Sequence, residues 1–136
     1  MINFQRLQPH QRAEYESVLF SCPPRGCEYS FANLFLWGRK KVAEQEGFLL
    51  MQSQFDRKNV YIFPVGEGNL KRALDAVIHD AEMRGIRCCL AALTEEECRL
   101  VEQLYPGQFH FYCDRDSYDY VYAIDDLADL KGRKLQ

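Results

Sequence analysis

The stretch from residue 59 to residue 93 constrains the fold more than any other part of the sequence. It starts with an apolar run that ends at Pro64, and the turn Gly66-Glu67-Gly68-Asn69 follows. Apolar residues then recur at helical spacing, at Leu70, Ala73, Leu74, Val77, Ile78 and Ala81. Gly85 is placed to end that helix, and residues 86–93 form a second apolar run. A strand, a helix and a strand in this order predict a crossover within one sheet.

The segments before this stretch predict two helices and a hairpin. In chain order we expect an edge strand at 2–7, a helix from Pro9 to Cys22, a helix from Ser30 to Lys41, and hairpin strands at 47–54 and 59–64. Ser30 is a suitable N-cap, and the basic end of the second helix suits the partial negative charge of a helix C-terminus. Trp37 lies off the apolar stripe, so we expect this helix to be covered on more than one side.

The segments after it predict another helix and a pair of strands. Thr94-x-x-Glu97 is a capping box that opens a helix, which we expect to reach Tyr105. Residues 109–113 and 118–123 alternate like antiparallel strands, and a short helix is expected at 125–130. The expected fold class is therefore α/β (an α+β sandwich), with helices flanking a central mixed, largely antiparallel sheet in a single domain of residues 1–136.

Composition argues against several kinds of partner. A chain of 136 residues with a formal net charge of −3 has no overall basic character of the kind that nucleic acids select. It contains no apolar run of about 18 residues, and no basic segment followed by an apolar leader. We therefore expect no transmembrane segment and a cytoplasmic location.

The six cysteines and three histidines form no recognisable metal, disulfide or catalytic pattern. The interval between Cys22 and Cys27 is not that of a usual zinc knuckle, and the adjacent Cys88 and Cys89 point to opposite faces of a strand. We expect reduced thiols that act as small core residues, and no metal. The histidines are expected at the surface or its rim.

Two interpretations remain open for the Gly66-Glu67-Gly68-Asn69 turn. Glycines before a helix N-terminus let backbone N–H groups approach an anion such as a phosphate, with Asn69 as the N-cap. The positive charges of Lys71 and Arg72 are unfavourable near the partial positive charge of a helix N-terminus, and a bound anion would offset this repulsion. Alternatively, the turn needs its glycines only for positive φ, and Glu67 supplies the negative charge itself.

A second candidate site is the segment Arg115–Tyr122. On a strand, Tyr118, Tyr120 and Tyr122 would share one face, and Asp119 would lie on the other. Carboxylates beside an arginine and several phenols could position an amine or a nucleotide. The alternative is structural: the arginine pairs with a neighbouring aspartate, and the tyrosines pack with their hydroxyls at the rim.

Four ordered segments together resemble one bacterial family. They are Ser30–Trp37, Phe63–Gly66, Arg115–Tyr122 and Leu127–Lys134. The family comprises uncharacterised proteins similar to the C-terminal domain of phosphatidylglycerol lysyltransferases. The resemblance implies a GNAT-like (acyl-CoA N-acyltransferase) fold, repeated twice in a chain about twice this length. This chain would be the first repeat, and a second GNAT-like repeat would be its partner.

The resemblance also implies roles for particular residues. The donor would be an acyl-CoA or an aminoacyl-tRNA, with Gly66, Gly68 and Asn69 offering backbone donors to its phosphate. Asp116, Asp119 and Tyr120 would line the acceptor side, and no residue is identified as the catalytic base. Acetyltransferases usually carry Gln or Arg at the start of this loop, whereas here Pro64 and Val65 precede the first glycine. A competing hypothesis is therefore a non-catalytic, degenerate repeat that acts as a scaffold or interaction domain; homo-oligomerisation stays open.

Overall fold

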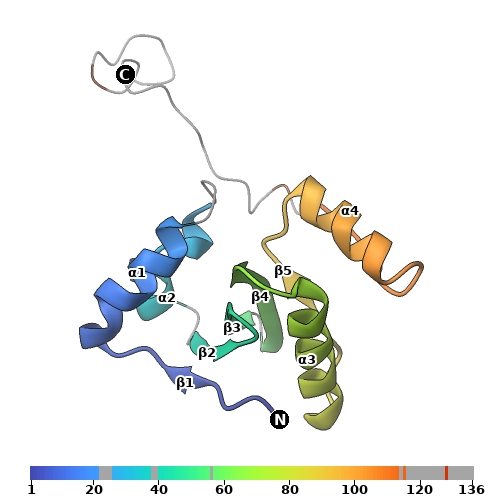
Figure 1. Ribbon diagram of the computed structural model, residues 1–136, viewed down its shortest axis with the longest axis horizontal. Coiled ribbons are helices and arrows are strands. Elements are labelled where there is room, and N and C mark those ends of the chain that lie inside the picture. Colours follow the sequence, from blue (N-terminus) through green and yellow to red (C-terminus); the bar gives the residue numbers. More distant parts are fainter. Residues whose placement is uncertain (22–25, 38–39, 56, 114, 116–127, 129–136) are drawn as a thin grey trace.

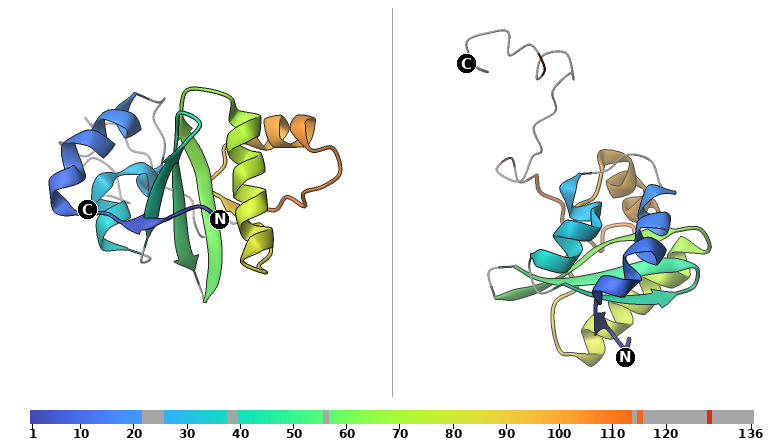
Figure 2. Two further views of the ribbon diagram at one scale, coloured as in Figure 1. Left: turned by 60° about the horizontal axis from the view of Figure 1, so that its bottom comes forward. Right: turned by 90° about the vertical axis from the view of Figure 1, so that its left-hand side faces the viewer.

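A computed structural model describes residues 1–21, 26–37, 40–55, 57–113, 115 and 128. Five strands form a single sheet, and helices lie on both of its faces (Figures 1 and 2). In chain order the elements are β1 (Gln5–Arg6), η1 (Pro9–Gln11), α1 (Arg12–Phe20), η2 (Cys27–Tyr29), α2 (Phe31–Leu36), β2 (Lys41–Gln45), β3 (Phe48–Phe55), β4 (Lys58–Gly66), α3 (Leu70–Met83), β5 (Leu90–Ala91) and α4 (Glu95–Leu104).

The sheet is mixed and largely antiparallel, as expected. Its strand order is β1-β2-β3-β4-β5, and only the β4–β5 pair is parallel. The connection through α3 is therefore the predicted crossover. Between β2 and β3, Glu46 and Gly47 have φ values of 56° and 81°, and a two-residue type I′ hairpin turn requires positive φ at both positions.

The sheet lies between two layers of helices, as the left view of Figure 2 shows, and an apolar cluster fills the space on each face. On one face, α1, η2 and α2 pack against side chains of β2, β3 and β4. This cluster includes Tyr15, Leu19, Tyr29, Phe31, Leu34, Val42, Leu49, Met51, Ile62 and Val65. On the other face, α3 and α4 cover Phe48, Leu50, Tyr61 and Phe63. The apolar stripe of α3 supplies Ala73, Leu74, Val77 and Ala81 to this second layer.

The second helix is shorter than predicted. Ser30 is its N-cap, as expected, and accepts a hydrogen bond from the Asn33 amide, but α2 ends at Leu36. Lys41 opens β2 instead of ending the helix, and the Lys40 side chain turns inward. Trp37 is 69% exposed, so the described residues of this chain do not cover it, and coverage by another chain stays a prediction. The β2 strand was missed because Val42 is its single fully buried residue.

The C-terminal part departs further from expectation. The strand expected at 86–93 is formed only by Leu90–Ala91, and it ends where the backbone leaves the extended conformation at Ala92, with φ 62°. Residues 109–113 form no strand. The Phe109 ring instead packs edge-on against Tyr105 of the α4 C-cap, which keeps this segment beside the helix. The strand expected at 118–123 lies outside the described residues, as does nearly all of the helix expected at 125–130.

The described cysteines are less buried than expected, and Cys22 lies outside the described residues. Cys88 and Cys98 are half-buried, whereas Cys27, Cys89 and Cys113 are exposed, so the expectation of core thiols is wrong for these three. Cys88 alone packs against the apolar cluster beneath α3, since alternation along the chain turns Cys89 away from it. All three histidines are exposed, which confirms their expected position.

Candidate functional site

The glycine turn joins the end of β4 to the start of α3. Gly66 is half-buried, and Glu67, Gly68 and Asn69 are exposed, so the turn lies at the surface. The Asn69 side chain accepts a hydrogen bond from the Arg72 amide at 3.1 Å and is the predicted N-cap. This cap satisfies one of the N–H groups that a helix N-terminus leaves without an intrahelical partner.

The two glycines of this turn contact another backbone segment. Gly66 and Gly68 have φ values of 149° and 151°, and the Glu46-Gly47 hairpin turn lies directly against them. A Cβ on Gly66 would overlap the Gly47 carbonyl, and a Cβ on Gly68 would overlap the Glu46 carbonyl. The Glu67 amide also donates a hydrogen bond to the Gly47 carbonyl at 3.2 Å. This packing accounts for both glycines without any ligand.

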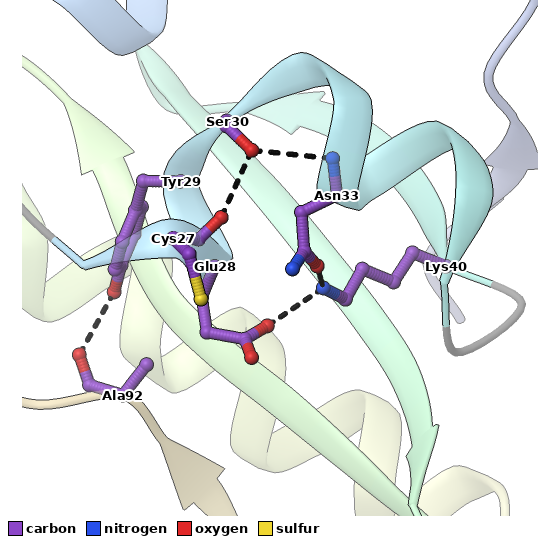
Figure 3. A network of polar contacts seen from close by, with 7 residues as sticks. All are labelled: Cys27, Glu28, Tyr29, Ser30, Asn33, Lys40 and Ala92. Carbon is purple, nitrogen blue, oxygen red and sulfur yellow. Dashed lines mark hydrogen bonds and ion pairs between the residues drawn. The ribbon is translucent and has the colours of Figure 1, made fainter. Parts of the chain in front are cut away.

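Beside this turn, the two parallel strands diverge. β4 and β5 pair only at Tyr61–Leu90 and Ile62–Ala91, after which β4 continues to Gly66 paired with β3 alone. Open α/β sheets commonly bind ligands where parallel strands end and separate. The Tyr29 hydroxyl of η2 lies in this divergence, 3.0 Å from the Ala92 carbonyl (Figure 3). It also lies 3.3 Å from the Phe63 carbonyl. The hydroxyl group thus lies within hydrogen-bond distance of one carbonyl of β4 and of the carbonyl that directly follows β5.

A buried lysine lies next to Tyr29 in the same layer. The Lys40 side chain is 4% exposed, and its ammonium group lies 2.6 Å from Glu28 Oε2 and donates to Asn33 Oδ1 (Figure 3). Glu28 is 42% exposed, so the pair spans the boundary between core and solvent. A buried ammonium group requires such partners, because desolvating it without them is costly. The network joins η2, α2 and the start of β2.

A second charged network lies on the opposite face of the sheet. Asp80 of α3 is fully buried and accepts hydrogen bonds from the Tyr61 hydroxyl (2.8 Å), Arg84 Nε (2.7 Å) and the Ile2 amide (2.7 Å). Burial raises the pKa of the Asp80 carboxyl, but the hydrogen bonds from Arg84, Ile2 and Tyr61 outweigh this and hold it below its usual value. Burial and the Asp80 carboxylate raise the pKa of Tyr61.

Neither the buried Cys88 thiol nor a cluster of metal-binding side chains provides a catalytic centre in the described part of the chain. Burial raises the pKa of the Cys88 thiol to about 11, so this thiol stays protonated at neutral pH and is a poor nucleophile. No cluster of three or more His, Cys, Asp and Glu side chains is arranged to hold a metal ion in the described part of the chain.

The structure brings the predicted donor-binding residues together but leaves the acceptor residues untested. Gly66, Gly68 and Asn69 form one turn. Asp116, Asp119 and Tyr120 lie outside the described residues. The sequence did not predict the roles of Tyr29 and Lys40. The partners of Tyr29 are far away in the sequence, and those of Lys40 follow no regular helix or strand spacing. A signal for Asp80 was present, since this carboxylate follows Val77 on the apolar stripe of α3.

Comparison with known proteins identifies the family. Residues 20–136 match the family described as phosphatidylglycerol lysyltransferase, C-terminal. The chain belongs to this family. The match covers all four segments on which the resemblance rests, and it includes the region of Asp116, Asp119 and Tyr120.

One solved structure shares the whole fold of the chain. It is the crystal structure of a conserved protein of unknown function from Bacteroides thetaiotaomicron VPI-5482, with 31% sequence identity and a TM-score of 0.87. The similarity covers 100% of this chain and 47% of that one, so the chain spans about half the length of the solved protein. No curated protein matches the chain significantly. Among the described residues, no helix has the length and apolar character needed to cross a membrane.

Proposed function

We propose that this chain is the first GNAT-like repeat of a longer protein of acyl- or aminoacyl-transferase descent. The observation that carries the proposal is the family match over residues 20–136. The strand–turn–helix–parallel strand order around Gly66–Asn69 supports it, as does the twofold length of the solved relative. The intact protein would transfer an acyl or aminoacyl group to an amine or hydroxyl acceptor in the cytoplasm, and its substrate is unidentified.

In this proposal the α3 N-terminus receives a phosphate of the donor. Gly66, Gly68 and Asn69 would present backbone N–H groups, and Arg72 would add charge from the first helical turn. The Arg72 side chain is 68% exposed and forms an ion pair with Glu46 at 3.6 Å, so an incoming anion would compete with Glu46 for it. Asp116, Asp119 and Tyr120 would contact the acceptor.

Calorimetric titration of the full-length protein with acetyl-CoA and CoA tests the acyl donor. If CoA binds, a concentration of 100 times its Kd stabilises the protein by about 2.7 kcal/mol. Arg72→Gln should then weaken binding about fivefold, the effect of one exposed charge contact. Arg99→Gln is the matched control, because Arg99 is also exposed and lies 3.6 Å from a glutamate. No binding at millimolar CoA contradicts an acyl-CoA donor.

The aminoacyl-tRNA donor requires a separate measurement. Binding of tRNA to the full-length protein should weaken steeply as salt is raised, because phosphate contacts release counterions. Absent or salt-independent binding contradicts this donor. Failure of both titrations would favour the second function.

The second candidate function is a non-catalytic repeat that supports its partner. The Glu46-Gly47 turn occupies the inner side of Gly66 and Gly68, and the Tyr29 hydroxyl fills the divergence of β4 and β5. Groups of the chain itself therefore occupy the places where a donor would bind, which favours a repeat without a ligand. Co-expression of this chain with the segment that follows it should yield a stable complex without either donor. Separate, non-associating halves would contradict a scaffold.

A further inference from the structure

A row of polar side chains crosses the sheet at the end remote from the glycine turn. Arg6, Lys41 and Gln52 are register partners in β1, β2 and β3, so their side chains lie on one face. Tyr61 continues the row in β4, which places it on the α3 face. Arg6, Lys41 and Gln52, with Ser53, Gln54 and Asn59, line a depression of about 300 Å³.

The charge of this depression is unbalanced. Arg6 and Lys41 lie directly opposite one another in the β1–β2 ladder, and like charges in such pairs are destabilising. Neither residue forms an ion pair with another described residue, although Arg6 also borders a neighbouring depression that carries Glu14 and Glu44. No carboxylate is among the described residues that line the 300 Å³ depression. An anion in it would offset the repulsion between the two cations.

Gln52 is among the residues that line this depression, and it carries a buried hydrogen-bond donor. Gln52 is 9% exposed, and within the described structure its side-chain nitrogen has no hydrogen-bond partner. The proximity of the Gln52 side chain partly offsets the rise that burial causes in the pKa of the Tyr61 hydroxyl. The Gln52 nitrogen nevertheless makes no hydrogen bond of ordinary geometry with that hydroxyl. Buried amide donors are nearly always paired with protein, water or ligand. An oxyanion in the depression would supply the missing acceptor.

We propose that this depression binds a small oxyanion, the phosphate or carboxylate group of a ligand. Arg6 would hold it through its planar guanidinium fork, Lys41 through a point charge, and Gln52 through its unpaired N–H. The carboxamides of Gln54 and Asn59 would contact the remainder of the ligand. The site is distinct from the glycine turn, since Gln52 and Gln54 lie four and six residues along β3 from Phe48, which pairs with Gly66.

Calorimetry and urea unfolding of the full-length protein test this site, with inorganic phosphate and acetate as separate probes at constant ionic strength. We expect saturable stabilisation by the oxyanion that fits, and the comparison of the two probes identifies its class. Arg6→Gln combined with Lys41→Gln should raise the Kd at least about tenfold. Gln52→Leu should also abolish stabilisation while leaving the protein folded, because it removes an unpaired donor from a buried position.

Two further variants separate this site from other anion sites. Arg12→Gln removes an exposed arginine outside the depression, paired at 2.9 Å with Glu16, and should leave the Kd unchanged. Arg72→Gln removes charge at the glycine turn and should likewise have no effect here. The proposal is overturned if neither probe gives saturable stabilisation, or if the Arg6/Lys41 variant binds as tightly as the unaltered protein. A loss confined to Arg72→Gln would assign the anion to the glycine turn instead.

Discussion

At the scale of single residues, the buried charges determine which contacts the fold cannot lose. Asp80 and Lys40 are both almost completely enclosed, and each is surrounded by named partners. Removing one member of a buried charged pair leaves the other desolvated and unpaired, which is more damaging than losing a surface pair.

Asp80→Asn should lower the free energy of unfolding by about 3 kcal/mol, because Arg84 and the Ile2 amide lose their charged acceptor. Urea unfolding measures the effect. Glu82→Gln is the control on the same helix: the Glu82 side chain is 72% exposed, and its change should stay within about 0.5 kcal/mol. Equal effects of the two substitutions would contradict a dominant role for the Asp80 network.

Stability should also fall in acid in a way that depends on Asp80. Its folded-state pKa lies below the ordinary value of about 3.9, so in the folded protein it stays ionised to lower pH than in the unfolded chain. The unfolded chain therefore binds more protons below about pH 4, and the contribution of Asp80 is lost as pH falls through the folded pKa. Unfolding measured from pH 6 to pH 2.5 should show a shallower decline for Asp80→Asn than for the unaltered protein.

At the scale of elements, the clearest dependence is between the β2–β3 turn and the turn before α3. Each turn supplies the glycines that let the other approach. Gly47, Gly66 and Gly68 all have positive φ, and a Cβ on any of them would overlap backbone of the opposing turn. The hairpin thus positions the start of α3, and with it the proposed donor site.

Gly68→Ala should destabilise the protein by about 1–3 kcal/mol more than Gly107→Ala. Both glycines have positive φ, so both substitutions carry a conformational cost, but nothing lies within 4 Å of a Cβ at Gly107. The difference between them therefore combines the overlap with the Glu46 carbonyl and the greater backbone strain at φ 151°, a value that residues other than glycine hardly adopt. Thermal unfolding of the two variants makes the comparison, and equal losses would mean that the two turns do not depend on close approach.

At the scale of the whole molecule, Tyr29 connects the helical layer to both parallel strands. Its ring packs in the cluster beneath α1 and α2, while its hydroxyl reaches the Phe63 and Ala92 carbonyls. This single side chain therefore closes the divergence of β4 and β5 and links residues separated by 63 positions in the sequence.

Tyr29→Phe should cost about 1–2 kcal/mol, because the ring keeps its packing while two carbonyls lose their donor. Hydrogen exchange should then accelerate selectively in β5 and the residues that follow it. Tyr15→Phe is the control, as Tyr15 is buried in the same cluster but does not bridge these strands. Uniform acceleration throughout the protein in Tyr29→Phe would indicate a general loss of packing rather than an opened divergence.

Local patterns were sufficient for the elements that repeat a periodic signal. The stripe of α3, its Asn69 cap, the Thr94–Glu97 capping box and the crossover each depend on residues close together in sequence, and all are present. The family could also be inferred from ordered motifs. In contrast, β2 has little apolar alternation, and it is a strand because β1 and β3 pair with it on either side.

The sequence by itself therefore determined the mixed α+β architecture, the helix caps and the family. Tertiary structure decided what the glycines contact, which partners surround the buried Lys40, and that Asp80 accepts a hydrogen bond from the Ile2 amide. The physical reason is that periodicity and capping are short-range properties. Backbone approach and the pairing of buried charges arise only when distant segments are brought together by the packed sheet.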